Sequence, residues 1–539
     1  MITKNVGEIL EANVTLSVEC IDRMYLNVYQ PRLQYVGGIR HFFEYHRGNV
    51  IASPVLMSRM THTFVEHLKH FIGSHKIKQV HFKSGQRKDE VTQALLKTHD
   101  GEEGVLYVGI AQEKFSTFRS NKVKNTKEEF NPLAFIRSSV MCNQYYFYIF
   151  DDDFGPLFIK MSSYFPYTIR VNLNGHEFVK RQLKKKGIGY EALDNGLLSC
   201  EQPDVLEGLA AQVNEETVNG VIQKWLEKLP SPFTEEDREA GFTYDISILQ
   251  SEFALTQVFK KPIQGRQFFE SVMREHLDLG RPEMMSLIFK RRVTKRTPSR
   301  YQTRVITRDT VPSLQAIYKH TRIKQYFKEG LALRTETVIN NTRDFDIGKR
   351  LKNLPELRVK GFETNRRLLE AQLTSQNCMI GESVFQEITT GKSVDQQRVS
   401  GLKFGDSRVM AVLQALCILA IFTKGFTNRM LKEKVTGLLS KKPGDITSNQ
   451  MTYDLRRLKL HGMVERISHS NRYQITKKGM NICFFMEKLH ARLFRPGLSE
   501  IFETAHAEDN SKTTKTINKA LMKLNNAMDQ LIQSAEMTF

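Results

Sequence analysis

The chain has 539 residues and lacks several features that would assign it to a class at once. Its 6 cysteines stand singly in the sequence, so they spell out neither a zinc-finger ligand set nor a thioredoxin-like pair. Glycine and proline, with 32 and 15 residues, are too sparse for a fibrous or a disordered chain. We therefore expect a folded protein with free thiols in a reducing cytoplasm.

Long apolar runs are also missing. The most apolar stretch, residues 409–422, is interrupted by Gln414 and is shorter than the roughly 20 residues that a membrane helix needs. Residues 1–11 contain no apolar core of an export signal. The sequence contains no P-loop, no dinucleotide-binding glycine pattern and no Gly-x-Ser-x-Gly elbow. We therefore expect no membrane partner, and ATP-driven motors and the common hydrolases are disfavoured.

Acidic residues are scarce in two segments. The chain carries 79 Lys and Arg against 59 Asp and Glu, a net charge of +20. Residues 290–328 hold 12 basic residues and 1 acid, and residues 424–495 hold 16 basic residues and 5 acids. Each segment has a net charge of +11, so the rest of the chain has −2. Such segregation is typical of a surface that follows a phosphate backbone, so DNA is the expected partner and RNA the alternative.

Strand and helix patterns alternate in the first 200 residues. Residues 13–29 and 104–111 are rich in β-branched and aromatic residues, whereas residues 54–73 and 88–97 carry apolar residues at helical spacing. The pattern of residues 204–290 predicts mainly helix. The predicted fold class is α/β (mixed) and multidomain. The four predicted parts are an N-terminal α/β domain (1–203), a central helical and basic β-hairpin region (204–400), a winged-helix domain (401–500) and a C-terminal helical tail (501–539).

The clearest motif lies in residues 404–495, which predict three helices, a two-stranded wing and a closing helix in the order that a winged helix requires. The run Tyr453-Asp-Leu-Arg-Arg-Leu-Lys-Leu-His-Gly462, followed by Arg472-Tyr-Gln-Ile-Thr476, resembles the winged-helix DNA-binding domains of transcription regulators. The resemblance implies that the third helix, residues 449–461, enters the major groove and that Arg472 in the wing meets the DNA backbone. The candidate base or phosphate readers on this helix are Asn449, Gln450, Thr452, Tyr453 and Arg456. A winged helix used only for protein contacts is the alternative.

A second candidate surface lies in the central basic region. Residues 290–308 hold eight cations and no acid, a composition suited to the backbone of a single strand or of RNA. Residues 322–327 and 331–339 predict a β-hairpin whose basic and aromatic residues alternate onto one face. The candidate contacts of this surface are Arg291, Arg292, Lys295, Arg296, Arg300, Arg304, Lys324 and Lys328. A salt-bridged edge sheet is the alternative.

Four carboxylates are the candidates for catalysis. Asp22 and Glu113 lie on predicted strands, and Asp151 and Asp153 lie at the turn of a predicted hairpin. Carboxylates at strand ends can gather around Mg²⁺ for two-metal phosphodiester cleavage. A magnesium cofactor and a metal-dependent nuclease are therefore one hypothesis for the amino-terminal domain.

Two other readings of the same region stay open. Gln112 and Lys114 match the end of a restriction-type nuclease core, with Asp89 upstream. Turn chemistry alone would also account for the aspartates of the hairpin turn.

The tail carries a short apolar seam. Between residues 517 and 531, apolar residues repeat with 4-3-4-3 spacing over about two heptads. Residues 513–535 are therefore predicted either to form a homodimer contact or to pack on the winged helix.

Four further motifs point to a relationship across most of the chain. They are Tyr164-Phe-Pro-Tyr167, Asn174-Gly-His-Glu177, Leu193-Asp-Asn-Gly196 and Arg334-Thr-Glu-Thr337. With the winged-helix segment, they are similar to a widespread family of functionally uncharacterised bacterial proteins, which implies a bacterial cytoplasmic setting and no particular activity. We expect a nucleic-acid-binding multidomain effector, from a mobile or defence element, in which the winged helix holds DNA and the central basic region holds a second strand or RNA. A non-enzymatic transcription regulator and an RNA-binding scaffold are the alternatives.

Overall fold

The structure is a computed structural model with two compact units. The large unit comprises Met1–Met273, Met284–Asn377 and Ile421–Lys424, and the small unit comprises Arg274–Glu283, Cys378–Ala420 and Gly425–Phe539. The residues that the structure describes are 6–83, 85–86, 88–122, 133–278, 313–378, 380–394, 396–442, 444–491, 523 and 526. Within these residues, no helix combines the length and the apolar character that a membrane span requires.

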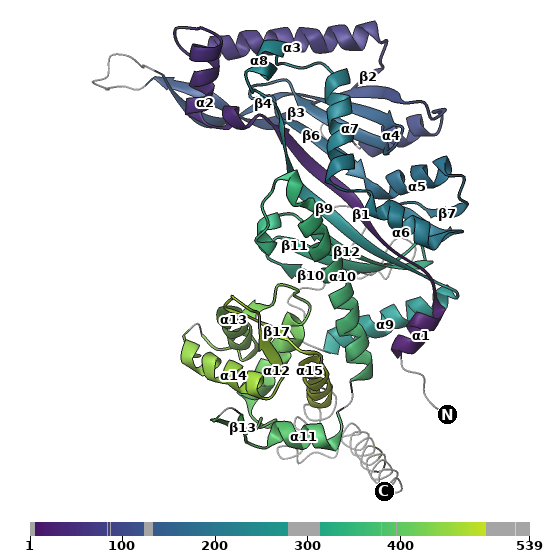
Figure 1. The fold of residues 1–539 in the computed structure, drawn as a ribbon, viewed down its shortest axis with the longest axis vertical. Helices are drawn as coiled ribbons and strands as arrows, with labels where there is room; N and C mark the ends of the chain where they lie inside the picture. The colour runs from purple at the N-terminus through teal and green to yellow at the C-terminus, as the bar shows by residue number, and fades with distance from the viewer. Residues whose placement is uncertain are drawn as a thin grey trace, which may run out of the picture. The chain divides into compact units, whose positions relative to one another are not determined.

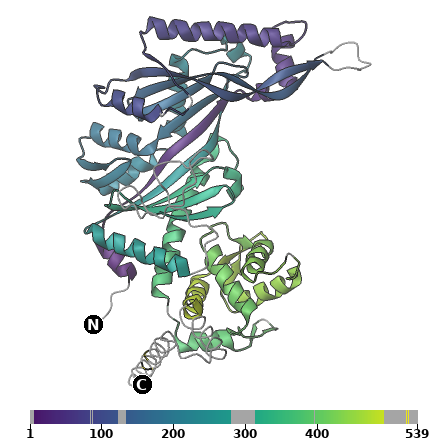
Figure 2. The same cartoon turned by 180° about the vertical axis from the view of Figure 1, so that it is seen from behind.

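A ten-stranded sheet organises the large unit (Figure 1). Its strand order is β10-β11-β12-β9-β1-β6-β5-β4-β3-β2, and every described neighbouring pair is antiparallel except β2 with β3. The strands of this sheet are β1 (Val14–Tyr29), β2 (Gln79–His81), β3 (Gly104–Lys122), β4 (Leu133–Asp151), β5 (Gly155–Ser162), β6 (Ile169–Asn174), β9 (Asp245–Phe259), β10 (Ser313–Tyr318), β11 (Thr321–Lys328) and β12 (Ala332–Ile339). The strands twist from one end of the sheet to the other, as Figures 1 and 2 show from opposite sides.

Helices and a small hairpin accompany this sheet. The hairpin consists of β7 (Tyr190–Leu193) and β8 (Gly196–Cys200). The helices are α1 (Val6–Asn13), α2 (Val36–Arg40), α3 (Pro54–Ser74), α4 (Lys88–Leu96), α5 (Gly175–Lys185), α6 (Pro203–Ala211), α7 (Glu215–Lys228), α8 (Glu235–Glu239), α9 (Pro262–Asp278) and α10 (Leu354–Asn377). Short helical segments lie at Pro31–Gln34, His41–His46, Thr342–Phe345 and Leu351–Asn353.

Strand β9 overturns part of the sequence prediction. Residues 245–259 were expected to be helical, but they form a central strand that pairs with β1 on one side and β12 on the other. None of its residues is exposed, and both helix α10 and strand β8 pack against it. A strand buried on both faces lacks the alternation of polar and apolar residues that identifies a strand, and for this reason the sequence pattern predicted a helix here. The predicted boundary at residue 203 is also wrong, because strands from both sides of it share one sheet.

The two faces of β12 meet different partners. On one face, α10 lies along the sheet, and Asn365 bonds to the carbonyl of Phe253 and accepts from Thr337. On the opposite face, α5 begins directly after β6. Asn174 caps this helix, because its side-chain oxygen accepts hydrogen bonds from the backbone N–H groups of His176 and Glu177. The β12 face that meets α5 carries the polar network described below.

The small unit contains five helices and two small sheets among its described residues. The elements are α11 (Glu382–Thr389), β13 (Lys392–Val394), β14 (Gln397–Val399), α12 (Ser407–Leu419), β15 (Phe426–Thr427), α13 (Asn428–Leu438), α14 (Ser448–Leu460), β16 (Val464–Arg466), β17 (Arg472–Ile475) and α15 (Lys477–Leu489). Strands β15, β17 and β16 form an antiparallel sheet in that order, and β13 pairs with β14. Helix α12 is buried along most of its length and packs against α13 and α15.

Two helical glycines provide a test of how tightly the large unit is packed. In Gly361 of α10, a Cβ would lie 2.3 Å from the ring of Phe253, whereas nothing lies within 4 Å of a Cβ at Gly220 of α7. We expect Gly361→Ala to lower the free energy of unfolding by about 1–3 kcal/mol, because the ring has to move. Gly220→Ala should raise it by up to about 1 kcal/mol through helix propensity. Urea unfolding followed by the fluorescence of Trp225, which is buried in this unit, measures both, and equal effects would contradict the close packing of α10 on β9.

Candidate nucleic-acid interface and buried polar network

The four carboxylates expected to bind magnesium do not converge. Glu113 on β3 lies opposite Cys142 on β4, and Asp151 lies nine residues farther along β4, which corresponds to about 30 Å. Asp22 is on β1, four strand spacings or about 19 Å from β3. Within the described residues, no group of three His, Cys, Asp or Glu side chains is arranged to hold a metal ion. The predicted magnesium cluster is therefore wrong for these residues.

Glu113 is instead the acceptor of a cationic pair. Its carboxylate lies 3.0 Å from Nζ of Lys88 and 2.5 Å from Nζ of Lys160, and Tyr146 Oη donates to it. Partial burial raises the pKa of Glu113, but these hydrogen bonds outweigh it and lower the pKa to about 2. A carboxylate engaged in this way is a structural anion. Its neighbours Gln112 and Lys114 are exposed.

The aspartates at the β4–β5 turn confirm the turn interpretation. Oδ1 of Asp151 accepts hydrogen bonds from the backbone N–H groups of Asp153 and Phe154, each at 2.9 Å. Its Oδ2 accepts from Lys224 and from the indole of Trp225, each at 2.8 Å. Burial raises the pKa of Asp151, but the hydrogen bonds led by Lys224 lower it overall. Asp153 is paired at the surface with Lys185 at 2.7 Å.

Asp22 belongs to a network centred on Arg334. The Arg334 side chain is fully buried. It donates a hydrogen bond to Asp22 Oδ2 at 2.9 Å, and its Nε forms an ion pair with Glu336 Oε1 at 3.1 Å. It also donates to the carbonyl of Asn195 at 2.5 Å and lies 2.7 Å from Nε2 of His176. The network therefore joins β12 to β1, to the β7–β8 turn and to α5.

His176 is held neutral in this network. An arginine only donates hydrogen bonds, so Nε2 of His176 accepts and the ring proton is on Nδ1. Burial lowers the pKa of His176 well below its usual value, and the neighbouring Arg334 lowers it further. A charged imidazole would face the guanidinium directly, which the buried site cannot accommodate.

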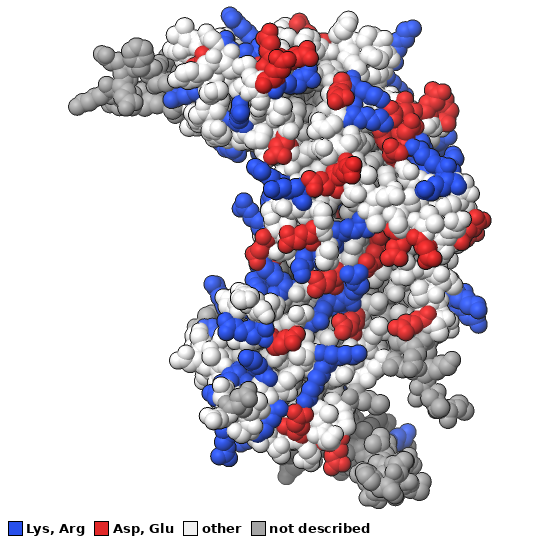
Figure 3. All heavy atoms as spheres, viewed as in Figure 1, with Lys and Arg blue, Asp and Glu red and all other residues white. Residues whose placement is uncertain are grey.

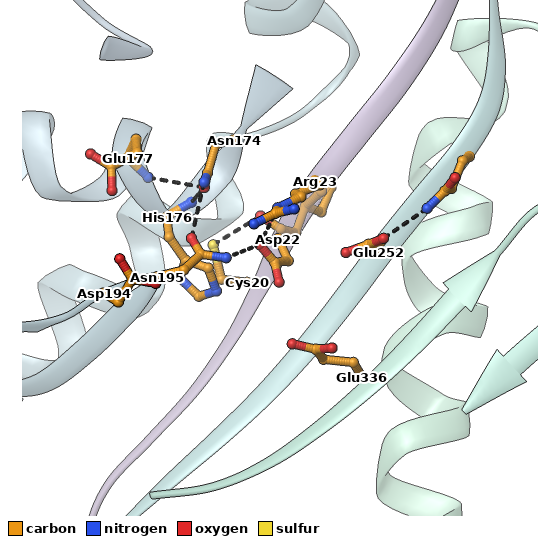
Figure 4. A network of polar contacts seen from close by, with 12 residues as sticks. Cys20, Asp22, Arg23, Asn174, His176, Glu177, Asp194, Asn195, Glu252 and Glu336 are labelled. Carbon is orange, nitrogen blue, oxygen red and sulfur yellow. Dashed lines mark hydrogen bonds and ion pairs between the residues drawn. The ribbon is translucent and has the colours of Figure 1, made fainter. Parts of the chain in front are cut away.

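Figure 4 shows how the residues around Asp22 are arranged. Asn174, His176 and Asn195 gather beside Asp22, while Glu252 lies on β9, next to β1, and Glu336 lies on β12, the strand beyond β9. Asn195 donates to Asp22 Oδ1 at 2.5 Å and accepts from Asn174, the last residue of β6, at 2.9 Å, so Asn195 holds the carboxylate and Asn174 holds Asn195. Asp22 therefore accepts bonds from an amide and from a guanidinium at once.

The basic residues of the β11–β12 hairpin are also engaged. The sequence prediction of this hairpin is confirmed, with paired residues from Thr321 to Ile339. Nζ of Lys324 lies 2.5 Å from Glu336, and Nζ of Lys328 lies 3.3 Å from Glu329. The structure thus places both lysines in ion pairs, as the alternative of a salt-bridged sheet describes.

The sequence analysis missed the Arg334 network, although it named three of its motifs. Asn174–Glu177, Leu193–Gly196 and Arg334–Thr337 converge on one site, yet they lie as far as 160 residues apart in the chain. The available signal was one arginine and one glutamate among the uncharged residues of β12, a strand whose eight residues are all buried. A buried arginine requires anionic partners, but sequence alone does not say which ones.

In the small unit, α14 presents one polar face to solvent. Asn449, Thr452, Tyr453 and Arg456 are exposed at positions i, i+3, i+4 and i+7, and Tyr453 keeps 45% of its surface accessible. The opposite face, with Leu455 among others, is buried. All five predicted readers on this helix, Gln450 included, are therefore exposed.

The fifth reader, Gln450, has a structural role. The helix begins one residue earlier than predicted, with Thr447 as its N-cap. Gln450 Oε1 accepts the backbone N–H of Thr447 at 2.8 Å and completes a capping box. On β17, Arg472 is half-buried and donates to the carbonyl of Gly425 at 3.2 Å.

Positive charge accompanies the exposed face of α14. Residues 425–491 hold 13 basic residues and 5 acids, a net charge of +8. Figure 3 shows Lys and Arg side chains over the region of α13 and α14. The other predicted contacts, Arg291, Arg292, Lys295, Arg296, Arg300 and Arg304, lie outside the described residues, as does the tail of residues 513–535 apart from two positions.

Comparison of the chain with protein-family models, with curated proteins and with solved structures gave no match.

Removal of the Arg334 guanidinium should destabilise the large unit. We expect Arg334→Met to lower the free energy of unfolding by about 3–5 kcal/mol, because the buried carboxylate of Asp22 loses its guanidinium and Glu336 keeps only Lys324 as a cationic partner. Arg350→Ala is the control, since that side chain is 66% exposed and its ion pair with Asp245 should contribute at most about 1 kcal/mol. Urea unfolding followed by Trp225 fluorescence compares the two, and a loss below 1 kcal/mol for Arg334→Met would refute the central role of this side chain.

The neutral state of His176 predicts a pH dependence. The unfolded chain binds a proton at His176 below about pH 6.5, whereas the folded chain does not, so stability falls as the pH falls. Between pH 7.5 and 5.5 the wild type should lose about 1.4 kcal/mol more than His176→Gln, whose amide oxygen can still accept from Arg334. Urea unfolding at the two pH values tests this, and parallel losses in the two proteins would show that His176 does not remain neutral.

Proposed function

We propose that this protein binds double-stranded DNA through residues 407–489, which we interpret as a winged helix. In this interpretation, α14 is the recognition helix and β16 with β17 is the wing. The order of helices and strands in this segment supports the interpretation. We place the protein in the cytoplasm, as the sequence predicts.

The observation that carries the proposal is the exposed face of α14. A helix that served only to complete the core would expose charged residues of either sign, whereas this face offers an amide, a hydroxyl, a phenol and a guanidinium in one strip. Such groups donate to base edges and to phosphates. The net charge of +8 on residues 425–491 favours the same partner.

The separation of the carboxylates makes a non-enzymatic DNA-binding protein the better supported alternative. Asp22, Glu113 and Asp151 each serve a different ion-pair network, so none of them is available to a shared metal ion. The proposal therefore follows the regulator hypothesis rather than the nuclease hypothesis. An RNA-binding scaffold remains the second candidate, supported by the basic composition of residues 290–308.

Charge removal on α14 tests the proposal. We expect Arg456→Ala to weaken binding of the full-length protein to a 30-base-pair duplex by about tenfold, which is about 1.4 kcal/mol. Lys184→Ala removes one exposed cation from the large unit and should change the affinity less than twofold. Fluorescence anisotropy with labelled duplex DNA and with RNA of the same sequence measures both.

Two results would count against the proposal. Equal losses of affinity in Arg456→Ala and Lys184→Ala would mean that the affinity for DNA depends on the total charge of the protein and not on the position of the cation on α14. Tighter binding to RNA than to the duplex would favour the scaffold.

A further inference from the structure

The short hairpin of β13 and β14 lies beside the exposed face of α14. The Tyr453 hydroxyl lies 3.0 Å from Oγ of Ser400, and Nε of Arg456 donates to Oε1 of Gln397 at 3.3 Å. His461, which follows α14, donates through Nε2 to the carbonyl of Ser400 at 3.2 Å. Tyr453 and Arg456 of α14, and His461 directly after it, therefore contact either the hairpin or Ser400, the residue that follows the hairpin.

The position of the hairpin is fixed by its base. The backbone N–H of Leu402 donates to the carbonyl of Ile388 at 2.7 Å, and both side chains are buried. A Cβ at Gly401 would lie 1.8 Å from the carbonyl oxygen of Thr389, so only glycine allows the two backbones to approach this closely. The hairpin is therefore packed against the rest of the small unit at its base.

The hairpin and α13 lie against opposite edges of the exposed strip on α14. Thr452 accepts a hydrogen bond from Asn428 at the start of α13, at 2.9 Å. Tyr453 is rotated about 100° from Thr452 around the helix axis and contacts the hairpin side. Asn449 and Arg456 project between these two directions. The strip is therefore flanked on both edges.

Groove dimensions determine what the flanking elements would meet. The major groove is about 12 Å wide, and a helix with its side chains is about 10–12 Å across. Once α14 fills the groove, an element on either edge lies over one of the two phosphate backbones. In helix-turn-helix proteins the helix before the recognition helix crosses the backbone, which is the place of α13 here.

Resting on the proposed DNA-binding function, we propose that the β13–β14 hairpin is a second phosphate-contacting arm, on the side of α14 opposite α13. Its cation is Arg398, which is exposed and forms no ion pair with any described residue. Ser393 lies opposite Arg398 in the hairpin register and adds a hydroxyl donor on the same face. Lys392 is not the contact, because it lies 3.0 Å from Glu387.

Glu387 also anchors the arm to the rest of the unit. Its carboxylate accepts from Lys392 and, at 2.5 Å, from Lys478 at the start of α15. Hydrogen bonds from these two lysines, that from Lys478 foremost, lower the pKa of Glu387 to about 2. The anchor is therefore charged at every pH at which DNA binding would be measured, and the positive charge of the arm is concentrated at Arg398.

The salt dependence of duplex binding tests the arm. Each phosphate contact contributes about 0.9 to the slope of log affinity against log salt concentration. We expect Arg398→Ala in the full-length protein to reduce the magnitude of that slope by about 0.9, with the same loss for duplexes of unrelated sequence. Lys184→Ala is the matched control and should leave the slope unchanged. Circular dichroism and Trp225 fluorescence verify that both variants are folded.

The outcomes separate the arm from the proposed function. If Arg456→Ala weakens duplex binding while Arg398→Ala leaves the slope unchanged, the arm is refuted and DNA binding by α14 stands. Tighter binding by Arg398→Ala would mean that the hairpin obstructs the helix, which also overturns the arm. If the wild type does not bind duplex DNA at all, both proposals fail.

Discussion

The buried guanidinium of Arg334 is the constraint on which the arrangement of the large unit depends. An arginine without solvent is tolerated only when anions and acceptors surround it, and here they come from four separate parts of the chain. Asp22 is 312 positions away, and Asn195 and His176 belong to a turn and a helix between them. The burial of the guanidinium is compensated only when all of these groups are in contact with it. The network therefore specifies how α5 and the β7–β8 hairpin lie on the sheet.

The two units use their charges in opposite ways. In the large unit, Glu113, Asp151 and Glu336 each bind one or more lysines or arginines, so these charges form ion pairs that connect elements of the fold. In the small unit, α14 keeps Asn449 and Arg456 on a surface where basic residues predominate. This difference explains how a chain with a net charge of +20 can fold its largest sheet around ion pairs and still present an electropositive face.

Local patterns predicted much of this structure, and long-range pairing accounts for the rest. The hairpin of residues 321–339 and the helix of residues 448–460 were predicted because alternation, turn residues and caps are encoded within a few positions. Strand β9 was missed because burial on both faces removes the alternation that identifies a strand. The expected convergence of the four carboxylates was missed for a related reason. Asp22 and Asp151 have the right chemistry, but their partners, Arg334 and Lys224, are chosen by the fold and not by their neighbours in the sequence.

The pairing of β1 with β9 also has a consequence for synthesis in the cell. Val14 pairs with Phe259, so a ribosome must add about 230 residues after β1, which ends at Tyr29, before that partner exists. At about 5–20 residues per second, the wait is roughly 10–50 s. During this time one edge of a 16-residue strand rich in apolar side chains has no partner. The nascent chain is thus a natural client for chaperones that shield unpaired strands, and its yield should depend on the speed of translation through residues 30–259.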